Sequence, residues 1–174
     1  IIKRLKPSWR NELEITDALD MLLNEKHVIT YKMITDYWKD TGTPEDIINA
    51  NKTILENIIP EFKAKKESIL LIEGKVSIGN ETCIGDHVKI KGPVIIGSKC
   101  KISGNTIIGP NTSIGNECMI SGGIIRDSII MNNCEIEKNV NLRNSIISSN
   151  SSIKQNKIEN EQILLLGEGT RILL

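Results

Sequence analysis

Aromatic side chains are scarce in this sequence, which has one Phe, two Trp and two Tyr among 174 residues. That scarcity disfavours a layered sandwich and suits a fold with thin layers of aliphatic side chains. A surplus of one charge is also missing, because 22 basic residues balance 22 acidic ones. We therefore expect neither nucleic acid nor an anionic membrane as a partner. No apolar run is long enough to span a bilayer.

Cysteine is sparse too, and the four cysteines form no CxxC pair and no Cys/His spacing. This excludes the usual zinc patterns and gives no sign of a secreted disulfide framework. We expect a reduced, cytoplasmic setting. The length suits one medium domain or two small ones that share an interface.

Isoleucine is abundant instead, and it recurs in strict steps of six. The nine positions are Ile72, Ile78, Ile84, Ile90, Ile96, Ile102, Ile108, Ile114 and Ile120. Four residues after each stands a small or β-branched residue, and two residues after each stands a turn former. A short strand and a corner repeated at fixed length are typical of a hexapeptide β-helix.

The period predicts the geometry of this β-helix. Residues two apart in a strand share a face, so each Ile and the small residue two before it point inward. Three strands make one coil, and residues eighteen apart stack in parallel ladders, such as Ile72, Ile90 and Ile108. We expect the turn former, two residues after each Ile, to adopt positive φ or a tight turn.

After Ile120 the step changes, and the best continuation mixes steps of five and six. It runs through Ile125, Ile130, Ile136, Leu142, Ile147 and Ile153. This predicts about five coils over residues 71–160, preceded by a linker over 61–70. We expect the apolar tail, residues 161–174, to cover the open end, whose last ladder would otherwise be an unpaired edge.

Stacking the coils predicts two further features. Cys100, Cys118 and Cys134 fall in one interior column, where a disulfide or a soft metal is possible but simple packing of small buried side chains is the favoured interpretation. Two outer faces are partly apolar, and an exposed apolar stripe usually marks an interface. We expect the coil to pack against copies of itself, as a trimer for preference, or against the preceding helical segment.

Residues 1–60 have a different pattern. Apolar spacing predicts a helix over 16–23 with Thr16 or Asp17 as its cap, and alternation predicts a strand over 27–38. A second helix begins with Thr43 as cap and Pro44 in the first position, and it stops at Pro60. The chain opens without a methionine, and we expect it to belong to something longer.

Two motifs in residues 1–60 resemble the sugar-1-phosphate nucleotidyltransferases. Residues 6–17 read KPSWRNELEITD and residues 38–46 read WKDTGTPED. Together with a hexapeptide coil and the ending Leu165-Leu166-Gly167-Glu168, they are similar to the C-terminal part of the long-form glucose-1-phosphate thymidylyltransferases. Asn11 departs from the family, which usually has Gly there. The resemblance implies a left-handed coil.

The resemblance also implies a reaction and its residues. In the family, a sugar 1-phosphate attacks the α-phosphorus of dTTP and releases pyrophosphate, with Mg²⁺ neutralising phosphate charge. Asp40 matches one of two Mg²⁺-binding carboxylates, Arg10 matches the arginine that meets the sugar phosphate, and Trp38 matches a residue of the sugar pocket. The reaction has no covalent enzyme intermediate, and the resemblance implies no catalytic side chain among these residues. The base (dTTP or UTP) and the sugar stay open.

The family's Gly-rich, nucleotide-binding loop is absent from the sequence. We therefore expect residues 1–60 to be the end of a catalytic domain, the complete enzyme to be active and this chain alone to be inactive. The main alternative is a hexapeptide acyltransferase that uses acetyl-CoA, with His87 as general base. His87 stands at a solvent-facing corner, which disfavours that role. A third reading makes the coil a purely structural module that oligomerises and positions the catalytic domain.

Overall fold

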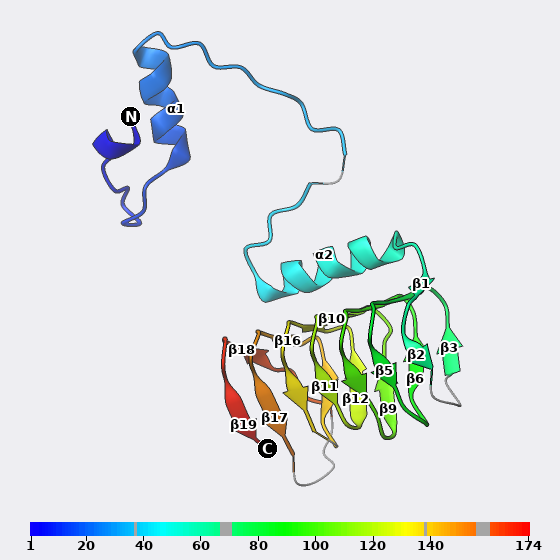
Figure 1. Ribbon diagram of the computed structural model, residues 1–174. Coiled ribbons are helices and arrows are strands. Elements are labelled where there is room, and N and C mark those ends of the chain that lie inside the picture. Colours follow the sequence, from blue (N-terminus) through cyan, green and yellow to red (C-terminus); the bar gives the residue numbers. More distant parts are fainter. Residues whose placement is uncertain (37, 67–70, 138, 156–160) are drawn as a thin grey trace. The chain divides into compact units, whose positions relative to one another are not determined.

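The computed structural model describes residues 1–36, 38–66, 71–137, 139–155 and 161–174. They form two compact units, Ile1–Trp38 and Lys39–Leu174. The first unit contains a short 3₁₀ helix (Ile2–Arg4) and α1 (Ile15–Asn24). The second contains α2 (Pro44–Glu56) and a parallel β-helix (Figure 1). No helix among the described residues is long and apolar enough to cross a membrane.

Three parallel sheets form the walls of the β-helix. The first sheet contains β1 (Glu61–Phe62), β4 (Val76–Ile78), β7 (Val94–Ile96), β10 (Thr112–Ile114), β13 (Ile129–Ile130), β16 (Ile146–Ile147) and β18 (Leu165–Leu166). The second contains β2 (Lys65–Lys66), β5 (Cys83–Ile84), β8 (Lys101–Ile102), β11 (Met119–Ile120), β14 (Glu135–Ile136), β17 (Ser152–Lys154) and β19 (Arg171–Leu173). The third contains β3 (Leu71–Glu73), β6 (Lys89–Lys91), β9 (Thr106–Ile108), β12 (Gly123–Arg126) and β15 (Asn141–Arg143).

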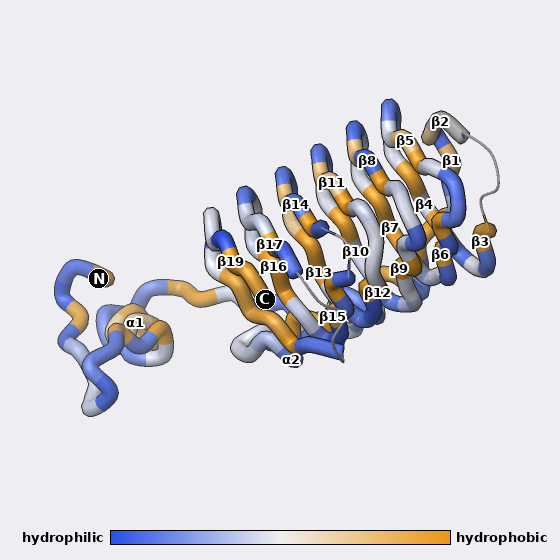
Figure 2. Tube along the Cα trace, turned by 90° about the horizontal axis from the view of Figure 1, so that it is seen from below, coloured by the Kyte–Doolittle hydropathy of each residue, from blue (hydrophilic) through white to orange (hydrophobic). Residues whose placement is uncertain are grey.

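The registers confirm the predicted columns. Ile90 pairs with both Ile72 and Ile108, and each of these pairs joins residues eighteen apart. The interior aliphatic side chains from Ile78 to Ile153 are fully buried, and Figure 2 shows apolar strands alternating with hydrophilic corners. Ile72 is the exception, at 36% exposed, because it lies in the first strand of its sheet. The shortened steps to Ile125 and Ile130 are confirmed as well.

The β-helix has about six turns, where the sequence predicts about five. The additional pairing comes from its two ends. β1 and β2, within the segment expected as a linker, pair with β4 and β5. β18 and β19, within the C-terminal tail, pair with β16 and β17. Leu166 and Ile172 of the tail pack against the interior cluster.

Positive φ occurs one residue later in most corners than the sequence predicts. It falls on the third residue after the interior Ile in eight corners: Glu81, His87, Lys99, Asn111, Glu117, Asn133, Asn139 and Asn150. It falls on the second residue at Gly74, Gly104 and Gly122, and also at Asp127 and Asn144, which stand in five-residue steps. The corner therefore tolerates non-glycine residues in the left-handed region, with their side chains largely in solvent.

Both helices form, but the predicted strand does not. α2 has the expected Thr43 cap, whose hydroxyl accepts from the Asp46 amide at 3.2 Å, and it ends at Glu56, before Pro60. α1 begins after Glu14, so the prediction of Thr16 or Asp17 as its cap is wrong. The described residues of 27–38 contain no strand. Tyr31 is 89% exposed there, and a strand without a neighbour to pair with has little to stabilise it.

α2 lies along the outer face of the first sheet (Figure 1). Its Ile48 and Leu55 are buried. The Ser113 hydroxyl of β10 donates to the Asn51 side-chain oxygen at 2.6 Å, and the Lys75 ammonium donates to the Glu56 carbonyl at 2.6 Å. The prediction that an apolar outer face packs against the preceding helical segment is thus confirmed for this sheet.

Candidate functional site

Arg10 lies in a tight loop that leads into α1. The Ser8 amide donates to the Glu12 carbonyl at 2.8 Å, and the Asn11 amide donates to the Ser8 carbonyl at 2.9 Å. Asn11 has φ of 60°, a conformation that glycine adopts freely and that asparagine tolerates better than most residues. Asn11 thus adopts a backbone conformation that the Gly of the resembling motif would adopt freely.

Glu14 holds the Arg10 guanidinium from one side. Arg10 Nη2 donates to both Glu14 carboxylate oxygens, at 2.8 and 3.0 Å. The Ser8 hydroxyl donates to the same carboxylate at 2.8 Å, and these hydrogen bonds from Arg10 and Ser8 lower the pKa of Glu14. Arg10 Nη1 has no hydrogen-bond partner within the described residues. The guanidinium therefore keeps a free donor while a carboxylate fixes its orientation.

Trp38 and Asp40 stand on either side of the boundary between the two compact units. Trp38 ends the first unit and is 71% exposed. Asp40 is near the start of the second unit, shortly before the Thr43 cap of α2, and is exposed. Its carboxylate has no hydrogen bond or ion pair with any described residue. Lys39, next to it, pairs with Asp46 at 2.9 Å.

Asp40 offers a carboxylate of the kind Mg²⁺ prefers. Within the described ranges, however, no three His, Cys, Asp or Glu side chains come together as possible metal ligands. The described residues therefore fit Mg²⁺ in one respect only, because Asp40 supplies a hard oxygen donor but no cluster of further ligands lies around it.

His87 stands at an exposed corner with φ of 62°. It borders a shallow hollow on the third sheet together with Leu71, Lys89 and Ile107. The expected solvent-facing position is confirmed.

The cysteine column is also confirmed, as packing. Cys100, Cys118 and Cys134 are buried free thiols, and each donates to a backbone carbonyl of the next turn, at 3.0 to 3.2 Å. Hydrogen bonding with the neighbouring sulfurs, together with burial, raises the pKa of the Cys118 thiol. The same hydrogen bonds lower the pKa of the Cys100 and Cys134 thiols to about 7. Burial of all three side chains, rather than their titration, is what supports packing as their role.

The anchor of α2 is a feature that the sequence analysis missed. Asp127, at a corner of the β-helix, pairs with Lys52 at 3.2 Å and accepts from the Asn111 amide group at 2.9 Å. Burial opposes ionisation of Asp127, but the hydrogen bonds from Asn111 and Lys52 outweigh it and hold its pKa below the ordinary range. Its position in a shortened step was the only available signal.

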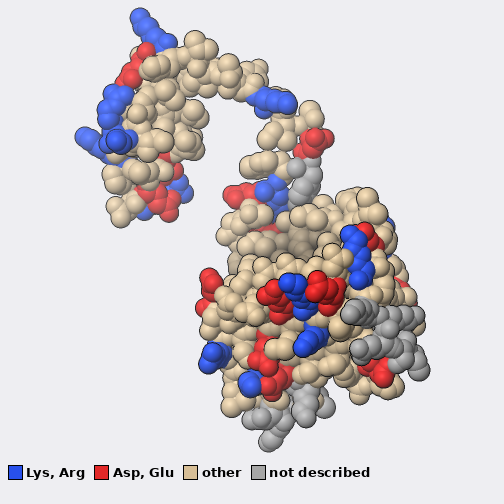
Figure 3. Space-filling model, in the orientation of Figure 1, with Lys and Arg blue, Asp and Glu red and all other residues tan. Residues whose placement is uncertain are grey.

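Charge on the molecule is otherwise dispersed. Acidic and basic side chains are interspersed on the visible face of the second unit (Figure 3). No patch of one sign stands out there, as the balanced composition suggests.

Two family models match the chain. Residues 1–57 match the model described as nucleotidyl transferase, and residues 90–172 match that of the GMPPB C-terminal domain. The first match contains Arg10, Trp38 and Asp40. The second covers most of the β-helix.

Relatives with curated names match nearly the whole chain. A glucose-1-phosphate thymidylyltransferase of Streptomyces antibioticus is 32% identical over 98% of this chain and 48% of the relative. The low-salt glycan biosynthesis nucleotidyltransferase Agl11 of Haloferax volcanii is 31% identical over 99% of this chain and 49% of the relative. The bifunctional protein GlmU of Methanococcus aeolicus is 37% identical over 91% of this chain and 38% of the relative. The chain thus spans about half the length, or less, of these relatives.

Proposed function

This chain belongs to the nucleotidyl transferase family, and from that premise we propose that it is the C-terminal part of a glucose-1-phosphate thymidylyltransferase-like enzyme. The complete enzyme would join a sugar 1-phosphate, glucose 1-phosphate for preference, to the nucleotidyl group of dTTP and release pyrophosphate. The observation that carries the proposal is the similarity over 98% of the chain to a protein of that name, with both sequence motifs inside the matched segment.

Arg10 is the residue we assign to the sugar phosphate. Its guanidinium is oriented by Glu14 and keeps Nη1 unbonded within the described residues. A planar guanidinium held in this way can donate to a phosphate oxygen without reorganising. Trp38 offers an exposed indole as one wall for the sugar ring.

Asp40 is the residue we assign to Mg²⁺, together with a second carboxylate from the remainder of the enzyme. When bound, the ion supplies charge neutralisation on the triphosphate. No other side chain of this chain is assigned to the chemistry, because an oxygen of the sugar phosphate is itself the nucleophile.

The exposed apolar residues of the first unit support the view that it is one part of a larger domain. Trp9 is 93% exposed, and Ala18 is the only buried residue of α1. Within a complete catalytic domain these side chains would have a core to join. We place that complete enzyme in the cytoplasm, in keeping with the free thiols.

The β-helix itself we assign to oligomerisation, as a trimer for preference. α2 covers the first sheet, whereas the third sheet turns Leu71, Ile107 and Ile124 outward, and Leu71 is 49% exposed. An unpartnered apolar face of this kind suits contact with another copy. Sedimentation velocity over a dilution series tests this assignment, and Ile107→Lys should shift the protein toward monomer.

Pyrophosphate release is the direct test of the enzymatic proposal. With dTTP, glucose 1-phosphate and Mg²⁺, the complete enzyme should release pyrophosphate and this chain alone should not. In the complete enzyme, Asp40→Asn should lower kcat about a hundredfold or more, as expected when a group that stabilises transition-state charge is lost. Arg10→Ala should mainly raise the KM for the sugar phosphate.

Asp36→Asn is a matched control, because Asp36 is an exposed carboxylate four residues before Asp40 and lies outside both motifs. It should leave kcat unchanged. Turnover by this chain alone, or full activity of Asp40→Asn, would contradict the assignment. UTP offered in place of dTTP determines which base the enzyme prefers.

A further inference from the structure

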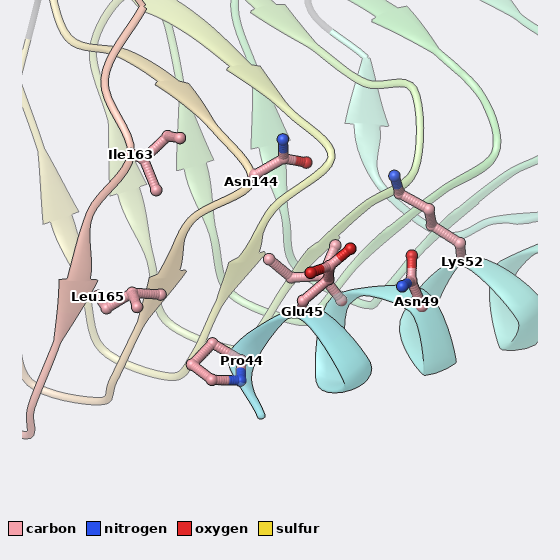
Figure 4. A pocket seen from close by; sticks show the side chains of 8 residues that line it. Pro44, Glu45, Asn49, Lys52, Asn144, Ile163 and Leu165 are labelled. Atoms are coloured by element: carbon pink, nitrogen blue, oxygen red, sulfur yellow. The ribbon is translucent and has the colours of Figure 1, made fainter. Parts of the chain in front are cut away.

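A groove in the second unit lies between the first half of α2 and the last turns of the β-helix (Figure 4). It encloses about 470 Å³, a volume within the usual range for small-molecule sites. Its walls come from segments about a hundred residues apart in the sequence. None of its residues belongs to the site proposed for nucleotidyl transfer.

The wall that the C-terminal tail contributes to the groove is aliphatic. Ile163 and Leu165 are 67% and 54% exposed there. Leu165 is held in place, because β18 pairs with β16 in the first sheet. Exposed aliphatic side chains on a concave surface favour a ligand with an apolar body that displaces water from them.

Polar side chains on both walls of the groove have no partner among the described residues. Glu45 and Asn49 project from α2 into the groove, and Asn144 lies opposite (Figure 4). In the part of the chain that the structure describes, the Glu45 carboxylate has no ion pair or hydrogen bond, and the two amide side chains have no hydrogen bond. Each can therefore turn toward a ligand without breaking an existing contact.

The groove carries one acidic and one basic side chain, and only the basic one has a partner among the described residues. Lys52 also lines it, but its ammonium pairs with Asp127 at 3.2 Å. Near the start of α2, Asp46 is likewise paired with Lys39. Glu45 is left as the uncompensated charge, so the groove favours a positively charged ligand.

We propose that this groove is a binding site for a small organic cation, an ammonium group carried on a compact apolar body. The ammonium group donates to the Glu45 carboxylate, with Asn49 and Asn144 as further acceptors, and the apolar body covers Ile163 and Leu165. The groove shares the second unit with Asp40, but none of its lining residues is assigned to the proposed nucleotidyl transfer.

Three probes of nearly equal shape test this proposal by NMR titration of the labelled chain. Cyclohexylmethylamine should bind saturably and shift the amides of residues 44–52 and 163–166. Cyclohexylmethanol, which is neutral, should bind at least about tenfold more weakly, the loss expected when a charge-assisted hydrogen bond is replaced. Cyclohexylacetate, which is anionic, should not bind.

Variants assign the binding to the groove. Glu45→Gln should weaken the amine about tenfold and leave the alcohol unchanged, whereas Leu165→Ser should weaken both. Glu56→Gln, on the same helix but outside the groove, is the matched control and should change neither. Thermal unfolding of each variant shows that the fold is retained. Absence of saturable binding, equal binding of the anion, or an unchanged affinity in Glu45→Gln would each overturn the proposal.

Discussion

The glycines that directly follow the interior isoleucines differ in how much room they leave for a Cβ atom. At Gly97 and Gly115, an asparagine side chain of the next turn lies where a Cβ would be. The Ser98 amide donates to Asn116 Oδ1 at 2.8 Å, and the Asn116 amide donates to Asn132 Oδ1 at 2.7 Å. These glycines make room for a ladder of side-chain to backbone hydrogen bonds along one corner.

Gly115→Ala should therefore destabilise the β-helix. The added methyl would collide with Asn132, whose backbone nitrogen would be 2.8 Å away, and the cost should be about 1–3 kcal/mol in the free energy of unfolding. Gly85→Ala is the matched control, because it occupies the same place in its step but its Cβ meets nothing closer than 3.6 Å. Its effect should stay within about 0.5 kcal/mol. Urea unfolding measures both, and equal effects would refute this account.

At the scale of elements, the docking of α2 depends on an irregularity of the repeat. Asp127 stands at the corner within the second of two consecutive five-residue steps, which end at Ile125 and Ile130. Asp127 joins Lys52 of the helix to Asn111 and to Arg143 of the β-helix. The side chain that anchors α2 thus lies where the six-residue period is broken.

The stability of the folded chain should depend on pH through the ionisation of Asp127. Because the pKa of Asp127 is lowered in the folded chain, its contribution is fully present above the ordinary aspartate value of about 3.9 and is lost as the pH falls below it. Asp127→Asn should lower the melting temperature near neutral pH, and the difference from the unmodified chain should shrink in acid.

Glu81→Gln, at an exposed corner, is the control for that measurement. It should change the melting temperature little at any pH between about 3 and 7. If Asp127→Asn and the unmodified chain kept a constant difference over this range, the ionised Asp127 would not be what holds α2.

For the whole molecule, the two units should differ in protection from hydrogen exchange. Each turn of a β-helix is stabilised by its neighbours, so amides of the central strands, β7 to β13, should exchange slowest. Those of β1 and β19 should exchange faster, and those of Ile1–Trp38 fastest, because that unit buries little apolar surface. Mass spectrometry after deuterium labelling measures this order. Equal protection of α1 and the central strands would contradict it.

Most of the β-helix could be predicted because its information is local and repeated. A period of six determines which side chains face inward, and even the changed steps after Ile120 follow from the spacing of aliphatic residues. The strand over 27–38 was mispredicted for the converse reason. Alternation indicates a capacity to pair, but pairing needs a neighbour, and the described residues provide none.

The candidate site, too, could be predicted only in part from the sequence. Arg10, Trp38 and Asp40 were named from motifs, and their assignments stay predictions. The bond between Arg10 and Glu14 is also local, since the two are four residues apart, yet only the folded loop shows that it leaves Nη1 unbonded. The groove of Glu45, Asn144 and Leu165 had no signal in the sequence, because its parts are distant in the chain and follow no shared period.

The amino-acid sequence alone thus specified the interior of the β-helix. A six-residue pattern of inward-facing aliphatic side chains is buried when the strands stack in parallel as a three-sided prism. Folding in three dimensions was needed to show what lies on the outside. It selected the sheet that α2 covers, the carboxylate that anchors the helix and the side chains left without partners. Those outcomes depend on contacts between distant segments, and such contacts are set by geometry and charge rather than by any local pattern.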